Sequence, residues 1–229
     1  MMLRDLYRLV FPATCCCCGR VLQGSEHDIC THCLMQLSWS HFTSQEGNPT
    51  EMRLFGRLPV DAASSLLEFK DGNSCQRVLH SMKYHDNAQL AKVMGAVLGE
   101  ELARSHRFDD VDLLVPVPLH PRRERQRGYN QSFMLCRGIA RTFPRPISEG
   151  DLVRTVYTQT QTRKGHTDRA TSMEDAFLAR YPQNLQGRHL LVVDDVLTSG
   201  ATIEAACRPL MSLPNIRLSI ATLAIAGAE

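Results

Sequence analysis

The stretch LLVVDDVLTSGAT, residues 190–202, joins an unbroken apolar run to two adjacent carboxylates and a turn rich in hydroxyl groups. Asp194 and Asp195 follow the apolar run directly, where a strand buried in a parallel sheet would end. The turn precedes a predicted helix, so its backbone amides offer donors and the positive end of a helix dipole to an anion. Carboxylates beside such a phosphate cradle are suited to accept hydrogen bonds from sugar hydroxyls. The stretch therefore predicts a ribose-5-phosphate site.

Other interpretations of this stretch are weaker. It would also suit an ordinary strand, turn and helix in which Asp195 or Thr198 caps the helix. Two consecutive acids after an apolar run, followed by Thr-Ser-Gly-x-Thr, favour the phosphate site. A receiver domain carries its paired acids near the N-terminus of the domain, whereas here only one short strand follows them. The sequence contains no Gly-x-x-x-x-Gly-Lys-Ser/Thr pattern, which excludes a Walker A loop.

Basic residues follow a second apolar run, VDLLVPVP at residues 111–118. The next stretch, 121–141, is predicted to be helical. Its basic residues near the start are Arg122, Arg123, Arg125 and Arg127. In a parallel sheet the preceding strand would end at the same edge as the aspartate pair, so these guanidinium groups could bind pyrophosphate or a nucleic-acid backbone. The alternative is a solvated helix face, partly balanced by Glu124.

The polar segment 158–175 contains almost no apolar residues, which predicts a long loop. Its candidate ligand-binding residues are Arg163, Lys164 and Arg169. One interpretation is a lid that supplies positive charge to a departing pyrophosphate and keeps water away from an oxocarbenium-like sugar cation. The other interpretation is an exposed surface loop without a ligand.

Six of the nine cysteines lie between residues 15 and 33. They include two Cys-x-x-Cys pairs, and thiolates at this spacing can reach one metal ion from a tight turn. The four candidate ligands are Cys15, Cys18, Cys30 and Cys33. Four protein ligands complete a tetrahedral Zn²⁺ shell, so the predicted site is structural and not catalytic. His27 and His32 are less favoured as substitute ligands.

Strands and helices are predicted to alternate along the rest of the chain, which is typical of a parallel sheet with helices on both faces. The predicted strands are 64–69, 111–118, 151–157, 190–195 and 216–225. The predicted helices are 2–11, 74–84, 88–105, 121–141 and 202–213. We expect an N-terminal helix with a zinc-ribbon-like module over residues 1–45, a polar linker over 46–60 and an α/β domain over 61–229.

Composition places the chain among ordinary globular proteins. Of its 229 residues, 43% are hydrophobic and 22% are charged, and the net charge of +2 gives no global attraction to nucleic acid or to membranes. No apolar run approaches the roughly 18 residues needed to span a bilayer, and the N-terminus lacks the apolar core of a signal peptide. We therefore expect a cytoplasmic protein without membrane insertion.

The motifs resemble those of a known superfamily. VVDDVLTSGAT is similar to the 5-phosphoribosyl-1-pyrophosphate (PRPP) binding motif of type I phosphoribosyltransferases. Over nearly its whole length the sequence resembles the ComF/GntX branch, which is linked to DNA uptake in natural competence. The matching segments are the two Cys-x-x-Cys pairs, FGR at 55–57, HSMKY at 80–84, VPVPLHPRRERQRGYNQS at 115–132 and RTVYTQTQTRKGHTDR at 154–169.

This resemblance implies a type I phosphoribosyltransferase-like fold and a site that takes PRPP together with Mg²⁺. It places the ribose hydroxyls at Asp194 and Asp195, the candidate catalytic residues. It places the 5′-phosphate at Leu197, Thr198, Ser199, Gly200, Ala201 and Thr202. The implied activity is transfer of ribose-5-phosphate to an unknown acceptor, with single-stranded DNA and other competence proteins as partners. The alternatives are a non-catalytic DNA- or protein-binding module and a zinc-stabilised scaffold without a ligand.

Overall fold

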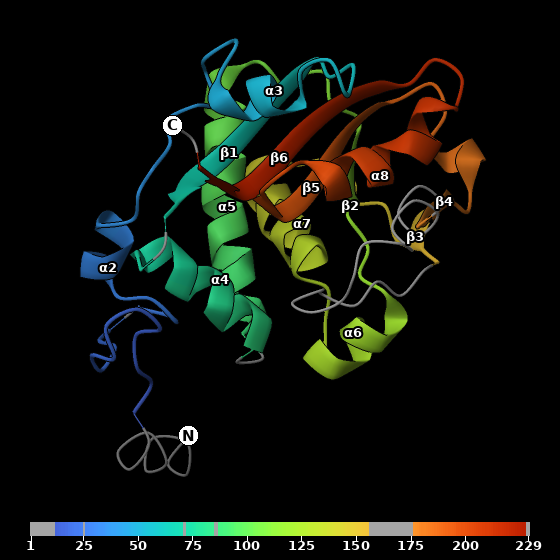
Figure 1. Ribbon diagram of the computed structural model, residues 1–229. Coiled ribbons are helices and arrows are strands. Elements are labelled where there is room, and N and C mark those ends of the chain that lie inside the picture. The colour runs from blue at the N-terminus through green and yellow to red at the C-terminus, as the bar shows by residue number, and fades with distance from the viewer. Residues whose placement is uncertain (1–11, 25, 71, 85–86, 156–175, 228–229) are drawn as a thin grey trace, which may run out of the picture.

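Four parallel strands form the central sheet of the protein. The computed structural model describes residues 12–24, 26–70, 72–84, 87–155 and 176–227 (Figure 1). The strands are β1 (Ala62–Phe69), β2 (Leu113–Pro116), β5 (His189–Leu197) and β6 (Arg217–Ala226). They lie in the order β1-β6-β5-β2, with Val193 of β5 opposite Pro116 of β2 and Ala221 of β6. This confirms the predicted α/β fold and brings the carboxyl ends of β2 and β5 to one edge.

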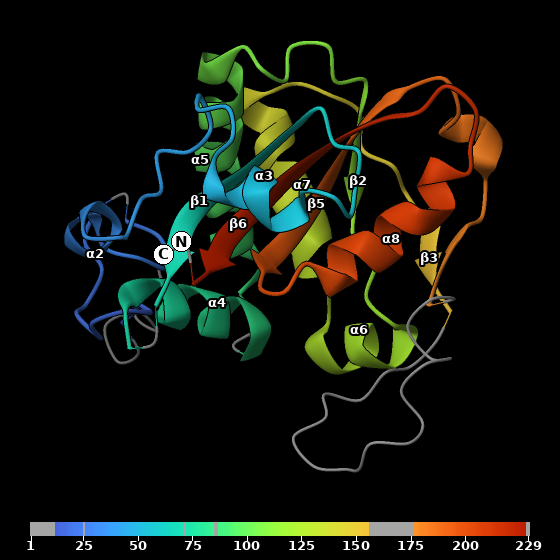
Figure 2. The same ribbon diagram turned by 45° about the horizontal axis from the view of Figure 1, so that its top comes forward.

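Helices cover both faces of this sheet (Figures 1 and 2). One face packs against α4 (Ser74–Tyr84), α5 (Ala88–Ser105) and α7 (Gln131–Thr142). The other face packs against α3 (Pro49–Leu54) and α8 (Ala201–Met211). Burial on two sides explains why the strands show no hydrophobic alternation. The fully buried residues of β5 are consecutive: Leu190, Leu191, Val192 and Val193.

Several predicted helices agree with the structure. α4 and α5 coincide with the predictions over 74–84 and 88–105, and α8 lies within two residues of its predicted bounds at each end. Two shorter elements are α2 (Thr31–Met35) and the 3₁₀ helix η1 (Pro182–Asn184). The predicted helix over 2–11 lies outside the described residues.

The predicted single helix over 121–141 is wrong, because two helices occupy this stretch. α6 (Pro121–Arg127) ends at Gly128, whose φ of 80° lies in the left-handed region that terminates helices. α7 then begins after Asn130, whose side chain accepts hydrogen bonds from the amides of Ser132 and Phe133. The break separates the basic helix from the apolar one, and the two take different directions in Figure 1.

A short antiparallel ribbon lies beside the parallel sheet. It pairs β3 (Leu152–Arg154) with β4 (Phe177–Ala179). The strand predicted over 151–157 is therefore part of a separate two-stranded sheet. No sequence pattern predicts β4, which is only three residues long. The segment 158–175, predicted to be a loop, lies outside the described residues.

The segment 46–60, expected to be a linker, contains helix α3. Asn48 caps this helix by accepting hydrogen bonds from the amides of Thr50 and Glu51. Leu54 at its end is completely buried. The sheet covers only one face of this helix, so its sequence is largely polar. For that reason apolar periodicity does not reveal the helix in the sequence. The boundaries between domains stay a prediction.

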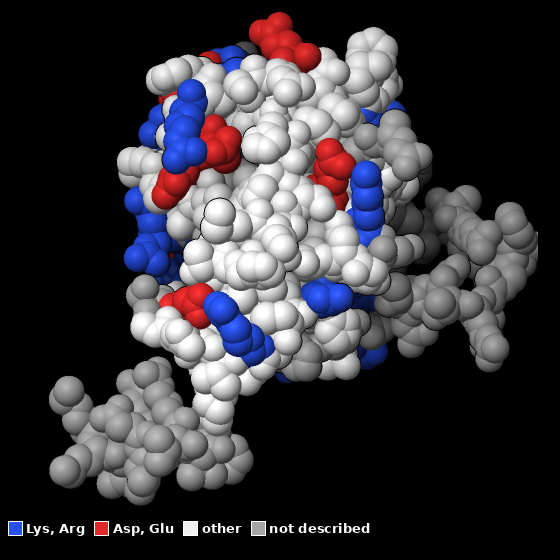
Figure 3. Space-filling model, turned by 90° about the vertical axis from the view of Figure 1, so that its left-hand side faces the viewer, with Lys and Arg blue, Asp and Glu red and all other residues white. Residues whose placement is uncertain are grey.

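Charged residues on the side of the molecule shown in Figure 3 lie in small groups of mixed sign, separated by uncharged surface. Such mixing agrees with the net charge of +2. Within the part of the chain that the structure describes, no helix combines the length and the apolarity that crossing a membrane requires.

The close contact between α5 and α7 depends on glycine. A Cβ atom added to Gly138 would lie 2.2 Å from the carbonyl oxygen of Lys92 and 2.8 Å from the Cα of Gly95. Both are backbone atoms, which cannot move unless the helices separate. We predict that Gly138→Ala lowers the free energy of unfolding by about 3 kcal/mol, measured by urea denaturation. This cost exceeds the gain of about 1 kcal/mol that alanine otherwise brings to a helix.

Arg104→Ala, on an exposed part of α5, is the matched control for this prediction. Arg104 forms surface ion pairs with Glu100 and Glu101, and exposed pairs of this kind contribute about 1 kcal/mol at most. If Gly138→Ala were as stable as the unmodified chain, the two helices would not approach as closely as described.

Candidate functional site

The two carboxylates at the end of β5 are met by side chains from α7 and α4. Asp194 is only 9% exposed, and its Oδ1 atom accepts hydrogen bonds from Ser132 Oγ (3.0 Å) and the Asp195 amide (2.9 Å). Asp195 is more accessible, and its Oδ2 atom lies 3.1 Å from Lys83 Nζ. One carboxylate is therefore held by a hydroxyl from α7 and the other by an ammonium group from α4.

Burial of Asp194 changes its titration. Burial and the neighbouring charge of Asp195 together raise the pKa of Asp194 to about 7. The hydrogen bonds from the Asp195 amide and Ser132, and the charge of Lys83, act in the opposite direction without cancelling this rise. A carboxyl group that titrates near neutral pH at the end of a strand is typical of a functional site.

The turn after β5 contains backbone amides that make no hydrogen bond to the described residues. β5 continues to Leu197, and Gly200, with a φ of 84°, precedes the first residue of α8. Among the described residues, the amides of Thr198, Ser199 and Gly200 have no hydrogen-bond acceptor. Donors of this kind before a helix form a cradle suited to a phosphate. The turn predicted to bind phosphate thus contains donors without acceptors, and phosphate binding by this turn stays a prediction.

The segment RGYNQS at 127–132 connects α7 to the end of α4. Tyr129 Oη donates to the carbonyl oxygen of Met82 (2.5 Å), and Gln131 Nε2 contacts the same oxygen at 3.4 Å. Asn130 Nδ2 donates to the Val117 carbonyl (3.0 Å), which follows β2. Because Met82 directly precedes Lys83, these bonds fix the position from which Lys83 reaches Asp195.

Lys83 and Ser132 were not predicted as site residues from their chemistry. Neither belongs to a local pattern that demands a carboxylate partner, and both partners lie far along the chain. Both residues do fall inside segments that carry the family resemblance, HSMKY and RGYNQS. That membership is the signal that could have identified them.

The basic helix α6 follows β2 at the same edge of the sheet as the aspartates (Figure 2). The predicted site residues on it are Arg122, Arg123 and Arg127. Arg127 Nη1 donates to Gln131 Oε1 (3.0 Å), so it also supports the start of α7. The other predicted basic residues, Arg163, Lys164 and Arg169, lie outside the described residues.

Arg154 on β3 is a further basic residue near the aspartates. Its guanidinium group stacks over the Phe177 ring at 5.2 Å from the ring centre. Burial and the charge of Arg123 lower the pKa of Arg154, whereas the charge of Asp194 raises it. Arg154 therefore lies within electrostatic reach of both α6 and the aspartate pair. It also lines a pocket of about 400 Å³, together with Pro116 and residues of α6.

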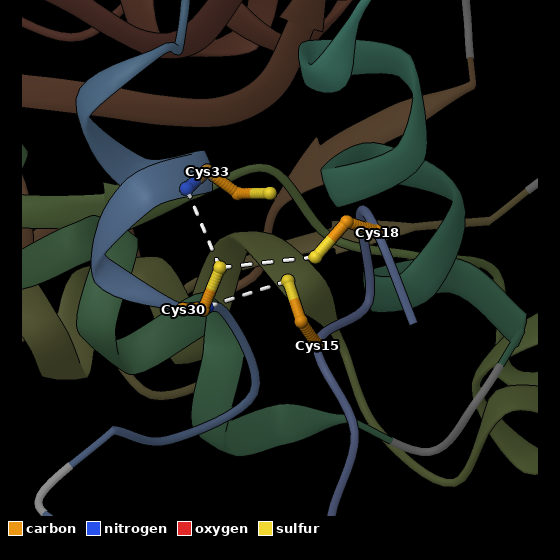
Figure 4. A group of neighbouring side chains, drawn as sticks. All are labelled: Cys15, Cys18, Cys30 and Cys33. Atoms are coloured by element: carbon orange, nitrogen blue, oxygen red, sulfur yellow. Dashed lines mark hydrogen bonds between the residues drawn. The ribbon is translucent and has the colours of Figure 1, made fainter. Parts of the chain in front are cut away.

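The four predicted metal ligands converge in space (Figure 4). The sulfur atoms of Cys15, Cys18, Cys30 and Cys33 all lie within 4.8 Å of one another. Four zinc–sulfur bonds of about 2.3 Å in a tetrahedron place the sulfurs about 3.8 Å apart. The Cys18 and Cys30 sulfurs are 3.8 Å apart. The donor set and its spacing therefore fit a structural Zn²⁺ ion, which the four thiolates would hold without an open position.

Backbone donors favour the thiolate form of one of these ligands. The amides of Cys17 and Cys30 donate to the Cys15 sulfur at 3.4 and 3.3 Å. Burial alone would raise the pKa of Cys15, but hydrogen bonds from the amides of Cys30, Cys18 and Cys17 outweigh it and lower the pKa to about 6. Thiolates are the form that binds zinc. His27 and His32 are not part of this cluster.

Comparison with known proteins shows that the chain is similar to proteins named for DNA utilization and for competence. DNA utilization protein YhgH of Escherichia coli K12 is 32% identical over 129 residues, covering 55% of this chain and 56% of that protein. YhgH of Escherichia coli O157:H7 is 27% identical over 82% of this chain and 80% of that protein. Competence protein F of Haemophilus influenzae is 26% identical over 86% of this chain and 84% of that protein. The chain is homologous to these proteins over most of its length.

This homology confirms the resemblance to the ComF family. The alignment with the K12 protein spans little more than half of the length of that relative. No family model matches the chain.

The cysteine cluster gives a prediction about metal content. We expect the purified chain to bind about one zinc ion, and Cys30→Ser to lose it because three thiolates leave the tetrahedral shell incomplete. Zinc released by a thiol-modifying reagent and quantified with a chromogenic chelator measures this. Cys16→Ser, a change outside the cluster but in the same segment, should retain the metal. Retention of zinc by Cys30→Ser would contradict the assigned ligand set.

The raised pKa of Asp194 predicts a stability that depends on pH. The pKa of this carboxyl is about 7 in the folded chain and 3.8 in the reference state. Protonated Asp194 therefore favours the folded state below about pH 4, and this contribution is lost as the pH rises through about 7. Asp194→Asn cannot ionise, so it should flatten the fall in the free energy of unfolding across this range, measured by urea denaturation.

Glu100→Gln is the control for this measurement, because Glu100 is exposed and its carboxylate pairs only with Arg104 among the described residues. It should leave the pH profile between about pH 4 and pH 7 close to that of the unmodified chain. Identical profiles for Asp194→Asn and the unmodified chain would contradict the assignment of the raised pKa.

Proposed function

We propose that the chain binds PRPP at the carboxyl end of β5 and serves in DNA utilization or uptake. The observation that carries the proposal is the juxtaposition of a paired carboxylate, Asp194 and Asp195, with three open amides before α8. Carboxylates suit the ribose hydroxyls, and amides at a helix N-terminus suit the 5′-phosphate. The names of the homologues, DNA utilization protein and competence protein F, support the biological setting.

Each end of PRPP has a matching part of the protein in this proposal. The ribose hydroxyls donate to Asp194 and Asp195, while Lys83 holds the latter carboxylate in place. The 5′-phosphate accepts hydrogen bonds in the turn 197–202. The pyrophosphate lies toward the basic groups Arg122, Arg123, Arg127 and Arg154. PRPP is expected as its Mg²⁺ complex, since Mg²⁺ prefers phosphate oxygens and keeps few protein ligands.

The proposed reaction is transfer of the ribose-5-phosphate group to an acceptor nucleophile. The bond between the sugar C1 and the pyrophosphate oxygen breaks, a bond from C1 to the acceptor forms, and pyrophosphate leaves with the bonding electrons. Positive side chains stabilise the charge that develops on the leaving group. Release of pyrophosphate in the presence of candidate acceptors is the activity to test.

A second candidate is a binding module that keeps this fold and handles single-stranded DNA or another transformation protein without catalysis. The observation that favours it is the basic helix α6, which places Arg122 and Arg125 on exposed positions. Phosphate contacts of this type make binding weaken with salt. PRPP binding without pyrophosphate release, together with salt-dependent DNA binding that needs these arginines, would favour this module.

Replacement of both acids tests the main proposal. Asp194→Asn with Asp195→Asn keeps the size of the side chains but removes the charged acceptors for the ribose hydroxyls. We expect the affinity for magnesium PRPP to fall about a hundredfold or more, measured by isothermal titration calorimetry. Asp109→Asn, an exposed acid distant in the fold, should bind like the unmodified chain. Equal affinity of the double variant and the unmodified chain would overturn the proposal.

A further inference from the structure

Two arginines from the N-terminal part of the chain hold the carbonyl groups of the binding turn. Arg53 on α3 donates through Nη1 to the Thr198 carbonyl and to the Ala226 carbonyl (3.0 Å). Arg57, just after α3, donates through Nη1 to the Ser199 carbonyl. The Thr198 and Ser199 carbonyls are consecutive in the turn whose amides have no acceptor.

Peptide geometry links these carbonyls to the open amides. In a planar trans peptide, the C=O of one residue and the N–H of the next point in opposite directions. When Arg53 binds the Thr198 carbonyl, the Ser199 amide must therefore point away from Arg53. When Arg57 binds the Ser199 carbonyl, the Gly200 amide is turned in the same way. The two arginines thus set the direction of two donors in the cradle.

The arginines are themselves held in fixed positions. Arg57 Nε and Nη2 both donate to Glu204 Oε2 on α8, at 3.0 and 2.6 Å. Arg53 Nη2 donates to the Gly227 carbonyl after β6 (2.6 Å). A Cβ atom added to Gly200 would lie 3.1 Å from Arg57 Nη1, so the guanidinium group lies directly against the turn. Each arginine therefore bridges the turn to a second element.

Helix α3, which carries Arg53 and precedes Arg57, is itself held in place by hydrogen bonds and burial. Glu51 on α3 accepts hydrogen bonds from the Ala63 amide of β1 (3.1 Å) and from Arg107 Nη2 (2.7 Å). The Glu51 and Arg107 side chains are 17% and 15% exposed, so solvent screens this pair less than a surface pair. Leu54 between the two arginines is completely buried. Helix α3 is thus hydrogen-bonded to β1 and to Arg107, which follows α5.

We infer that Arg53 and Arg57 are positioning residues for the phosphate cradle, acting through the backbone of the turn and not by contact with the ligand. This inference rests on the proposed function, because it names what orients the amides of that same site. The planar guanidinium group of Arg57 binds Ser199 and Glu204 at once, a geometry that the single ammonium group of lysine does not reproduce. The segment FGR at 55–57, which had no assigned chemistry, thereby receives a role.

Binding of ribose 5-phosphate and of magnesium PRPP by calorimetry tests the inference on the full-length chain. Arg57→Gln and Arg53→Gln should each weaken both ligands by the same factor, about tenfold, since both ligands carry the 5′-phosphate. Arg57→Lys, which retains the charge, should recover only part of the loss. Arg104→Gln, which removes an arginine from exposed ion pairs on α5, is the matched control and should bind normally.

A spectroscopic measurement separates positioning from a general loss of structure. In ¹⁵N-labelled protein, ribose 5-phosphate should shift the amide signals of Ser199 and Gly200. At saturating ligand these shifts should shrink in Arg57→Lys, even though this variant keeps its charge and its melting temperature. The lysine variant also serves for both measurements if the glutamine variants melt too low for use.

The possible results separate this inference from the proposed function. If the unmodified chain binds neither ligand, the proposed function fails and the inference falls with it. If it binds them and the arginine variants bind equally well, or show equal amide shifts, only the inference is overturned. Weakened binding of PRPP with normal binding of ribose 5-phosphate would also overturn it, because the arginines would then act on the pyrophosphate end.

Discussion

Burial of a carboxylate beside a second carboxylate is the constraint on which the proposed site depends. Two negative charges at the end of a covered strand repel each other, and burial of Asp194 raises its pKa to about 7. Such a pair persists only if other elements supply donors. Ser132 from α7 and Lys83 from α4 do so, at 3.0 and 3.1 Å. The contacts of Tyr129 and Gln131 with Met82 hold these two helices together.

The two faces of the sheet serve the two ends of the proposed ligand. Helices α4 and α7, on one face, supply the partners of the carboxylates. Helices α3 and α8, on the other face, supply the binding turn and the arginines that hold its carbonyls. β5 lies between these two pairs of helices. Its aspartates contact α7 and α4, and the turn that follows β5 leads into α8. A ligand with a sugar and a phosphate, bound as proposed, would therefore span both faces at the end of a single strand.

The sequence predicts local features of this protein better than it predicts contacts. Apolar runs and helical periodicity were sufficient to locate α4, α5 and the strands of the parallel sheet. The left-handed Gly128 ends α6, but a glycine within a helical pattern does not by itself reveal a break. The Arg57 contact with Ser199 joins residues 142 positions apart, and no local pattern encodes such a pair. The cysteine cluster was predictable, because the Cys-x-x-Cys spacing that is visible in the sequence is what lets two thiolates reach one metal ion.

The opposite edge of the sheet shows why residue types alone do not define a site. His189 at the start of β5 contacts Asp110 through Nδ1 (3.1 Å) and Ser219 through Nε2 (2.9 Å), the order of groups found in hydrolytic triads. Ser219 is completely buried on β6, so no substrate can reach its hydroxyl. Arg217 bonds to both Asp110 and Asp61 at this edge and neutralises charge there. This network joins strand ends, whereas the amides without acceptors and the partly exposed Asp195 lie at the carboxyl edge.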